Sequence, residues 1–550
     1  MTRGLAIARA VWCIGLCLPP AAALHAQQAG TATGVHRHPP PRAAKAAFDR
    51  STALFTRHDT TGALAAIRQA IELDPNYLAA HDQFVAVIQA KILIRDEANF
   101  ERTLALATRT LEKQYTAWEK RFPTAAGIPY GMGATFIAAE DPRAKPYLLR
   151  AVKLDPTLAK AYEMLSEDAS RWGDEPGARA FQAKAVAADP SNGEYAVSYA
   201  WDFHDTDPAK WRALMQGAVQ RFPKTQSGAE ALFSLGREAP TDSERVTYFE
   251  QLRSQYSPEK FRAAGGATYQ LFEVYTRVAP DKALALAQDL MGTSTDPEDQ
   301  RDWAVKVVLV RNLIFARSLL ADHKDAAAWA VLSATRVPKY STNDEMFALL
   351  QASAAAGSGK TQTAYDTLVA RFAKYPTDSV RAAVLRYATT LGKSSAQVDS
   401  AVWMQRNTVA KPAIPFKLGR YTSSDSASLA DYKGKVMLLT FWFPGCGPCR
   451  GEFPHFEKVL NEFKGRDVAY VGVNVFAGQD SYVLPFMRGT GYSFTPLHED
   501  ATIEKDYNVR GEPSNYLIDG TGRIVFSDFM IEDAAGEGSL RLMIESMLDH

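Results

Sequence analysis

Apolar residues at helical spacing run through most of the chain. Between residues 43 and 401, apolar side chains recur at intervals of three and four residues, and almost no stretch alternates as a half-buried strand does. The same region is rich in Ala, Leu, Arg, Glu and Gln. We therefore expect residues 43–401 to be helical.

Short turns divide this helical region at regular steps. Prolines 156, 190, 223 and 258 follow one another after 34, 33 and 35 residues, and each stands in a short turn. This period resembles that of tetratricopeptide repeats, in which helical hairpins stack into a curved solenoid with a concave face. The resemblance implies an α-helical repeat solenoid that binds a protein partner.

The turns also suggest where helices begin. An aspartate precedes the proline in Asp74-Pro75, Asp155-Pro156 and Asp189-Pro190. Proline is favoured in the first turn of a helix, and an aspartate before it can cap the free N–H groups. We therefore expect a helix to begin at each of these prolines. The glycine-rich stretch 127–133 interrupts the repeat pattern.

The first 42 residues stand outside the repeat pattern. Two arginines precede the apolar run Ala10–Leu18, and small residues follow it as far as Ala26, which is the order of a secretory signal peptide. We assign residues 1–26 to a signal peptide and the polar, proline-rich stretch 27–42 to a flexible spacer. The alternative is an uncleaved membrane anchor, although a spanning helix takes about 20 apolar residues.

The pattern changes after Asn407. Apolar runs of strand length at Val436–Phe443 and Val468–Val473 are typical of buried parallel strands. Two shorter runs, joined by the turn Asp519-Gly520-Thr521-Gly522, predict an antiparallel hairpin, and a helix is expected over the last residues from Glu537 to Leu548. We therefore expect an α/β domain over residues 411–550.

Charge and cysteine content narrow the function. The 62 basic and 62 acidic residues balance, so we expect no binding to nucleic acid, and no membrane contact beyond the signal segment. Two of the four cysteines lie inside the signal peptide, which leaves Cys446 and Cys449. A bridge across so short a loop removes little chain entropy, so the pair is expected to be reactive rather than structural. No second Cys or His pair follows at ligand spacing, so we expect neither a metal nor a cofactor.

The cysteines stand in a family motif. The segment Phe441–Pro454, with Cys446-Gly447-Pro448-Cys449 at its centre, resembles the active-site segment of TlpA-like thioredoxin-fold proteins. Glu512-Pro513 stands where that family carries a cis-proline. The resemblance implies a thioredoxin-like domain that exchanges disulfides with protein substrates and receives electrons from another protein. One departure is Gly445, because the family usually has a tryptophan there.

Roles for these residues follow from chemistry and from the resemblance. At a strand-to-helix junction the first sulfur lies at the helix N-terminus, which stabilises a thiolate. Cys446 is therefore the expected nucleophile and Cys449 the resolving thiol of a redox disulfide. If Glu452 is buried with a raised pKa, it can exchange the proton of Cys449; a solvated glutamate is the alternative. If Pro513 is cis, backbone groups beside it can pair with a bound chain; a trans turn proline is the alternative.

Four further residues of the motif regions are expected to contact the substrate: Trp442, Gly447, Pro448 and Glu512. The Gly-Pro pair between the cysteines resembles that of reducing thioredoxins, so we expect the chain to reduce disulfides of its substrates rather than to form them. We expect an exported thiol-disulfide oxidoreductase of the bacterial periplasm. Two alternatives are a protein-binding repeat scaffold with an accessory redox domain and a peroxide reductase, although Phe443 stands where peroxiredoxins have a threonine.

Overall fold

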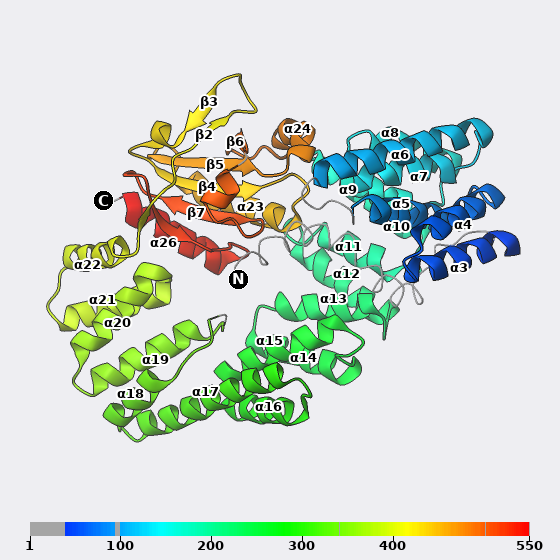
Figure 1. Ribbon diagram of the computed structural model, residues 1–550. Coiled ribbons are helices and arrows are strands. Elements are labelled where there is room, and N and C mark those ends of the chain that lie inside the picture. Colours follow the sequence, from blue (N-terminus) through cyan, green and yellow to red (C-terminus); the bar gives the residue numbers. More distant parts are fainter. Residues whose placement is uncertain (1–38, 94–99, 340, 501, 549–550) are drawn as a thin grey trace.

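The computed structural model describes residues 39–93, 100–339, 341–500 and 502–548. It divides the chain into a long array of helices and a C-terminal domain built on a sheet (Figure 1). The expected signal peptide, residues 1–26, and nearly all of the spacer 27–42 lie outside the described residues. None of the helices in the described ranges is long and apolar enough to span a bilayer.

The array extends from residue 42 to residue 407 and confirms the predicted helical region. Its helices are α3 (Arg42–Thr56), α4 (Thr60–Leu73), α5 (Leu78–Leu93), α6 (Phe100–Arg121), α7 (Gly127–Ala138), α8 (Ala144–Leu154), α9 (Ala159–Arg171), α10 (Glu175–Ala188), α11 (Gly193–Trp201), α12 (Pro208–Arg221), α13 (Gln226–Arg237), α14 (Asp242–Gln255), α15 (Arg262–Val278), α16 (Pro280–Thr293), α17 (Pro297–Ala321), α18 (Asp325–Ala334), α19 (Asp344–Gly357), α20 (Thr361–Lys374), α21 (Asp378–Thr390) and α22 (Ser395–Asn407).

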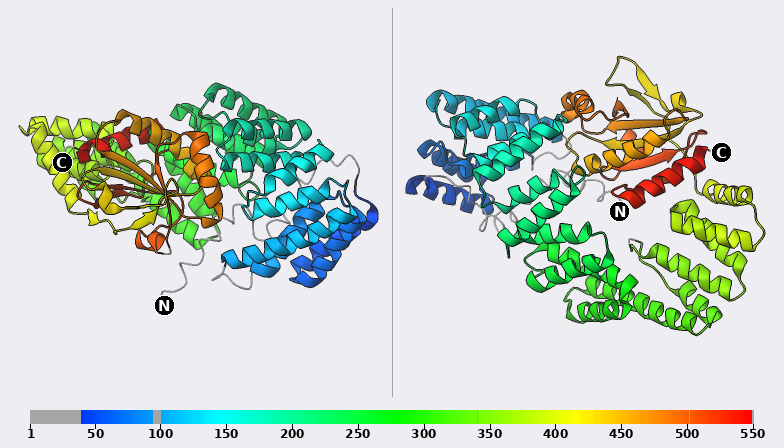
Figure 2. Two further views of the ribbon diagram at one scale, coloured as in Figure 1. Left: turned by 90° about the horizontal axis from the view of Figure 1, so that it is seen from above. Right: turned by 180° about the vertical axis from the view of Figure 1, so that it is seen from behind.

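Consecutive helices of the array pack against each other and form a series of apolar clusters rather than one core. This is the construction of a solenoid, in which each helical hairpin buries its apolar face against its neighbours. The array curves so that two of its parts, near α9 and near α22, reach the C-terminal domain (Figure 2). The assignment to tetratricopeptide repeats stays a prediction.

The Asp-Pro turns do not start helices, contrary to the prediction. Asp74, Asp155 and Asp189 each follow the last residue of a helix, and each side chain accepts a hydrogen bond from the backbone N–H two residues later. A short acidic side chain stabilises a turn in this way. After Asp74 the next helix begins only at Leu78. These aspartates therefore shape the turn between two helices.

The glycine-rich stretch 127–133 is not an interruption but part of α7. A Cβ atom at Gly131 would lie 2.3 Å from the hydroxyl of Tyr115, and one at Gly133 would lie 2.5 Å from a methyl carbon of Leu148. The glycines therefore let α7 approach its neighbours closely, and close packing offsets their weak helix propensity.

The C-terminal domain contains, in chain order, β1 (Lys411–Pro412), β2 (Lys417–Gly419), β3 (Ser426–Ser428), η2 (Leu429–Tyr432), β4 (Val436–Trp442), α23 (Gly447–Glu462), β5 (Val468–Asn474), η3 (Ala477–Gln479), α24 (Asp480–Thr490), β6 (Thr495–His498), α25 (Ile503–Asp506), β7 (Ser514–Ile518), β8 (Arg523–Ser527) and α26 (Ala534–Leu548). The six-stranded sheet has the order β1-β8-β7-β4-β5-β6. β4, β5 and β6 are parallel, whereas β7 and β8 form the predicted antiparallel hairpin.

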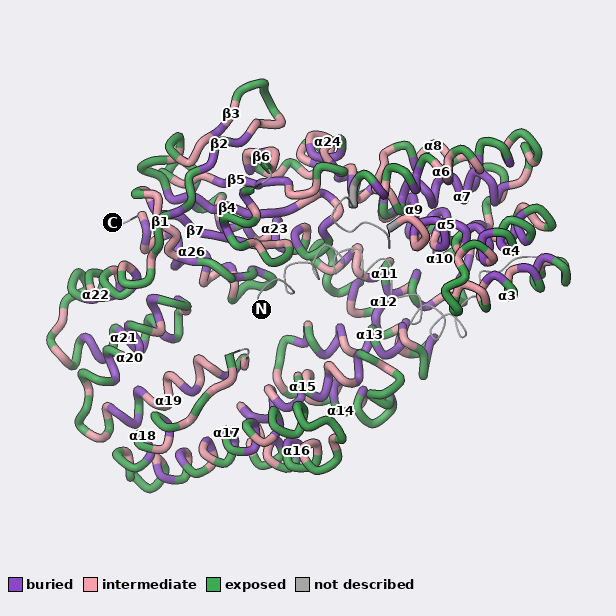
Figure 3. Tube along the Cα trace, viewed as in Figure 1, coloured by how far each residue is buried: buried purple, intermediate pink, exposed green. Residues whose placement is uncertain are grey.

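The strand β4 is the centre of this domain. It pairs with β5 on one side and β7 on the other, and all seven of its residues are buried (Figure 3). A central strand that is covered on both faces reads as a continuous apolar run, which is why the sequence revealed it. The predicted α/β domain is confirmed, and the end of β4 leads directly to the cysteines.

Candidate active site

The two cysteines lie where β4 gives way to α23. Cys446 is the residue that caps α23, and a disulfide joins it to Cys449 in the first turn of that helix. The Cys446 sulfur accepts a hydrogen bond from the Cys449 N–H at 3.2 Å. The first sulfur thus lies at the helix N-terminus, where a thiolate is stabilised by the helix dipole and by backbone N–H groups.

The disulfide can be approached from solvent on the side of the two residues that separate the cysteines. Gly447 and Pro448 are exposed, whereas Cys446 is only 3% exposed and Cys449 is fully buried. Gly447 and Pro448 therefore lie on the solvent side of the pair, and their contact with a substrate stays a prediction.

Trp442 does not offer a contact surface, which corrects its assignment to substrate binding. Its side chain is completely buried. The ring packs edge-to-face against Phe453 and Phe494, and it is tilted against Phe486. An aromatic side chain of this size buries a large apolar area in such a cluster. Trp442 therefore stabilises the core behind the redox loop instead of meeting a substrate.

Glu512 and Pro513 lie beside the end of β4. Ser514, the first residue of β7, pairs with Phe441 near the end of β4, so the segment before Ser514 lies next to the loop that carries Cys446. The peptide bond between Glu512 and Pro513 is cis, and both residues are half-buried. The fold thus brings the two sequence landmarks together at one edge of the domain.

Glu452 lies in the interior, one turn of α23 beyond Cys449. Its carboxylate is fully buried and accepts hydrogen bonds from the side-chain amide of Asn515 at 2.9 Å and from the N–H of Ile531 at 2.6 Å. Burial raises the pKa of Glu452 to about 7, although both hydrogen bonds act in the opposite direction. The two conditions for a proton carrier, burial and a raised pKa, are both met.

Two buried polar groups lie in the strand pair beside Glu452. Thr440 is directly opposite Asn515 in the register of β4 and β7. The Thr440 hydroxyl is buried without a hydrogen-bond partner among the described residues. Sequence reasoning did not identify Asn515, because nothing in its local pattern shows that it reaches across to α23. It fixes the carboxylate of Glu452 and thereby belongs to the site.

The helical array also reaches the redox loop. The N–H of Gly445 donates to the Gln479 side chain at 2.6 Å, and the Gln479 amide donates to Glu140, between α7 and α8, at 2.6 Å. A Cβ atom at Gly445 would lie 2.7 Å from the Gln479 amide nitrogen and 3.3 Å from Nε of Arg171. Gly445 therefore leaves room for the array. Its departure from the family pattern was the only sequence signal of this contact.

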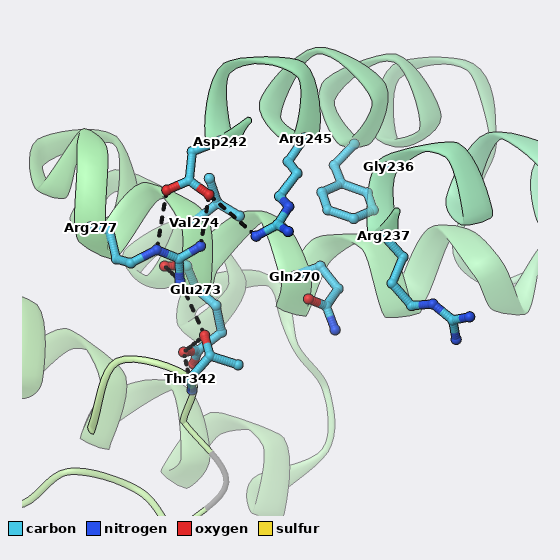
Figure 4. Close-up of a pocket in the computed structure, with 10 residues that line it drawn as sticks. Gly236, Arg237, Asp242, Arg245, Gln270, Glu273, Val274, Arg277 and Thr342 are labelled. Carbon is cyan, nitrogen blue, oxygen red and sulfur yellow. Dashed lines mark hydrogen bonds and ion pairs between the residues drawn. The ribbon is translucent and has the colours of Figure 1, made fainter. Parts of the chain in front are cut away.

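The array has a cavity of about 410 Å³ at α13 to α15 (Figure 4). Its charged side chains are paired: Arg277 contacts Asp242 at 2.9 Å and also donates to Thr342 at 3.1 Å, and Arg245 contacts Asp242 at 3.5 Å. None of the residues that line it belongs to the C-terminal domain. The cavity is therefore separate from the redox site.

Comparison with known proteins places the C-terminal domain in a family. Residues 409–527 match the AhpC/TSA family. The chain is 38% identical over 104 residues to the thioredoxin-like protein YneN of Bacillus subtilis, covering 18% of this chain and 61% of YneN. It is 34% identical over 105 residues to the thiol-disulfide oxidoreductase ResA of the same organism, covering 19% of this chain and 58% of ResA.

A third relative is the thiol:disulfide interchange protein HelX of Rhodobacter capsulatus, which is 32% identical over 117 residues. That match covers 21% of this chain and 62% of HelX, so the chain spans about three fifths of the length of these relatives. Among solved structures, a thiol:disulfide interchange protein of the thioredoxin family from Chlorobium tepidum TLS is similar, with 22% identity and a TM-score of 0.23. That match covers 25% of this chain and 97% of the other. The C-terminal domain is thus a thioredoxin-like domain of the AhpC/TSA family, with thiol-disulfide oxidoreductases of the ResA type among its relatives.

Proposed function

We propose that this chain is an exported thiol-disulfide oxidoreductase that reduces disulfides of protein substrates. The observation that carries the proposal is the arrangement of Cys446 and Cys449 at the N-terminus of α23, with the buried carboxylate of Glu452 one turn further on. Relatives that are named as thiol-disulfide oxidoreductases support it. The helical array would bind a protein partner, and a separate electron-donor protein would restore the dithiol.

The reaction begins from the reduced pair. The Cys446 thiolate attacks one sulfur of the substrate disulfide, so that a mixed disulfide forms and the other substrate sulfur leaves as a thiolate. Glu452, ionised in part because its pKa is about 7, accepts the proton of the Cys449 thiol. The Cys449 thiolate then attacks the Cys446 sulfur. The substrate leaves with two electrons, and the Cys446–Cys449 disulfide is formed.

Binding of the substrate would use the exposed side of the pair. Gly447 and Pro448 are exposed, and Glu512 and Pro513 border the same loop. An extended substrate strand could pair with backbone groups next to Pro513 and present its disulfide to Cys446. Trp442 would act only through the core.

The test is a redox-buffer titration of the full mature chain, followed by an assay of insulin disulfide reduction with dithiothreitol as the electron supply. We expect a two-electron transition near −270 mV, the range of reducing thioredoxins, and loss of both signals in Cys446→Ser. A potential near −120 mV would identify an oxidant instead. A chain without any titratable pair would favour the scaffold alternative. Amino-terminal sequencing of the exported chain would test cleavage near Ala26.

A further inference from the structure

Arg171, at the end of α9, is a buried cation next to the redox loop. Its side chain is 5% exposed, and its Nε lies 3.3 Å from the position of a Cβ atom at Gly445. One terminal nitrogen contacts Glu167 at 2.6 Å. Nε and the other terminal nitrogen are buried without a hydrogen-bond partner in the part of the chain that the structure describes. Buried donors are rarely left unpaired, so these two point to a group that is negative in another state of the site.

The contact that holds Arg171 in this place is built for close approach. A Cβ atom at Gly173, whose φ is +72°, would lie 2.7 Å from the carbonyl oxygen of Phe486, and one at Gly489 would lie 2.5 Å from the carbonyl oxygen of Gly173. Backbone thus packs on backbone between the α9–α10 turn and α24. The Tyr482 hydroxyl adds a hydrogen bond to Asp168 at 3.3 Å, and its ring packs on Trp172.

We propose that the helical array completes the redox site, in that Arg171 is a positioning residue that stabilises the thiolate form of Cys446. The inference rests on the proposed function, since it concerns the same cysteine pair. In the disulfide form the Cys446 sulfur is neutral. One terminal nitrogen of Arg171 then lies 2.6 Å from Glu167 and 3.8 Å from Glu140, while its other two nitrogens have no hydrogen-bond partner among the described residues. Reduction creates an anion at the residue that follows Gly445, where an added Cβ atom would lie 3.3 Å from Nε of Arg171. The interaction of a buried cation with such an anion is only weakly screened by salt.

The charges around Arg171 fit this role. Burial lowers the pKa of Arg171, but the carboxylates of Glu167 and Glu140 outweigh it and the pKa is raised, so Arg171 stays protonated. Burial raises the pKa of Glu140 and of Asp168, whereas the charge of Arg171 acts to lower both. Three further charges complete the surroundings: Lys145 acts on Asp168, and Arg450 and Glu175 face each other across the domain contact at 3.9 Å.

A more stable thiolate has two consequences. It raises the fraction of Cys446 that is nucleophilic at neutral pH, because the thiolate is the reactive form. It also stabilises the reduced pair, so the disulfide becomes a stronger oxidant. The array would thus set the balance between reduction and oxidation at a pair of cysteines more than 270 residues further along the chain.

The test compares Arg171→Met, Arg171→Lys and Arg406→Met in the full mature chain. Arg406 is a matched control, since it is 1% exposed and lies over the ring of Phe526 at the other contact between array and C-terminal domain. The readout is the pH midpoint of iodoacetamide alkylation of reduced Cys446. A midpoint reports thiolate formation, whereas a change in access alone alters the rate at every pH.

We expect Arg171→Met to raise this midpoint by about one pH unit, which is a ten-fold smaller thiolate fraction below the midpoint. Arg171→Lys should keep the midpoint close to that of the unsubstituted chain, because the positive charge is retained. Arg406→Met should leave the midpoint unchanged. In Arg171→Met the equilibrium constant with glutathione should shift about ten-fold in favour of the Cys446–Cys449 disulfide, so that the dithiol becomes a stronger reductant. An unchanged midpoint in a folded Arg171→Met chain, or an equal shift in Arg406→Met, would overturn the proposal.

Gly445→Val provides a second route to the same result, because its side chain would enter the space of Gln479 and Arg171. We expect a shift in the same direction as Arg171→Met and little further shift when both are combined. Fully additive shifts would contradict a shared cause. Failure of the proposed function is distinguishable, since it would appear in the unsubstituted chain as a pair that does not titrate.

Discussion

The C-terminal domain meets the helical array at two places that differ in construction. At the first contact, the turn after α9 packs on α24 through backbone, two glycines and buried polar groups. At the second, Leu542 of α26 packs into the apolar cluster of α19 to α22, and Arg406 lies over Phe526. The first contact borders the redox loop. The second lies by β8, which is two strands away from β4 in the sheet.

The second contact is suited to hold the C-terminal domain in place, whereas the first contact is suited to adjust the chemistry of the redox loop. An apolar contact such as that of Leu542 stabilises in proportion to the area it buries and tolerates small shifts. At the first contact, in contrast, backbone packs directly on backbone, and the N–H of Gly445 donates a hydrogen bond to Gln479. We therefore expect variants at both contacts to change stability, and only variants at the first contact to change the reactivity of Cys446.

The largest effect on stability is expected from Leu542→Ala at the second contact. Removal of a buried leucine side chain leaves a cavity and should lower the free energy of unfolding by about 3 kcal/mol. The measurement is urea unfolding, with Leu540→Ala as a matched deletion inside the C-terminal domain. Both variants should lose stability, while the alkylation midpoint of Cys446 stays unchanged. A shifted midpoint in Leu542→Ala would show that the two contacts are not separable.

The next effect concerns Glu452, whose partners belong to the C-terminal domain alone. Because its pKa is raised by burial to about 7 from 4.5, the folded chain holds a proton that the unfolded chain releases. This contribution to stability is full below pH 4.5 and is lost as the pH rises through 7. Between pH 4 and pH 8 we expect a loss of at most about 3 kcal/mol from this group.

Glu452→Gln should flatten this pH dependence in urea unfolding series, and Glu457→Gln on the same helix is the control that should retain it. Gly489→Ala or Leu542→Ala should not alter it, because neither contact includes Asn515 or Ile531. A pH profile that stays the same in Glu452→Gln would remove Glu452 from the proton transfer that we propose.

A smaller effect on stability is expected from Gly489→Ala at the first contact. The added methyl group would meet the carbonyl oxygen of Gly173, so the two surfaces must separate, with a loss of about 2 kcal/mol. Gly217→Ala is the matched control, since it adds a methyl group to a helix with no atom within 4 Å. Alkylation of Cys446 should change in Gly489→Ala only. Equal alkylation in both variants would mean that the first contact does not reach the redox loop.

Local patterns predicted the elements that carry the chemistry. The continuous apolar run of β4 and the Cys-X-X-Cys spacing are properties of neighbouring residues, so strand, helix start and disulfide follow without a structure. Asn515, Gln479 and Arg171 could not be found in this way. Their roles depend on which segments the fold brings together, and a buried asparagine or arginine looks like a surface residue in a sequence.

Two errors show the same limit. The place of Trp442 in the motif predicts substrate contact, but the direction of its side chain depends on the aromatic cluster from α23, α24 and the segment before β6. The Asp-Pro pairs predict helix starts, but aspartate suits a helix cap and a turn equally well, and here it follows the end of a helix. In both cases the residue type was informative and its surroundings were decisive.

The smallest effect is expected from Tyr482→Phe, which removes one hydrogen bond from the first contact. The Tyr482 hydroxyl donates to Asp168, whose other carboxylate oxygen is buried without a partner among the described residues. Loss of a bond to such a group should lower the free energy of unfolding by about 1 kcal/mol, more above than below the raised pKa of Asp168. The ring stays, so its packing on Trp172 is retained.

Tyr470→Phe is the control for this substitution, because its hydroxyl is also buried in the C-terminal domain but has no hydrogen-bond partner in the described ranges. We expect that variant to be neutral or slightly stabilising, since it removes an unpaired polar group. If Tyr482→Phe is also neutral at pH 8, the polar half of the first contact contributes no stability. The packing of Gly173 and Gly489 would then be sufficient to hold Arg171 in place. In that case Gly489→Ala should shift the alkylation midpoint as far as Arg171→Met does.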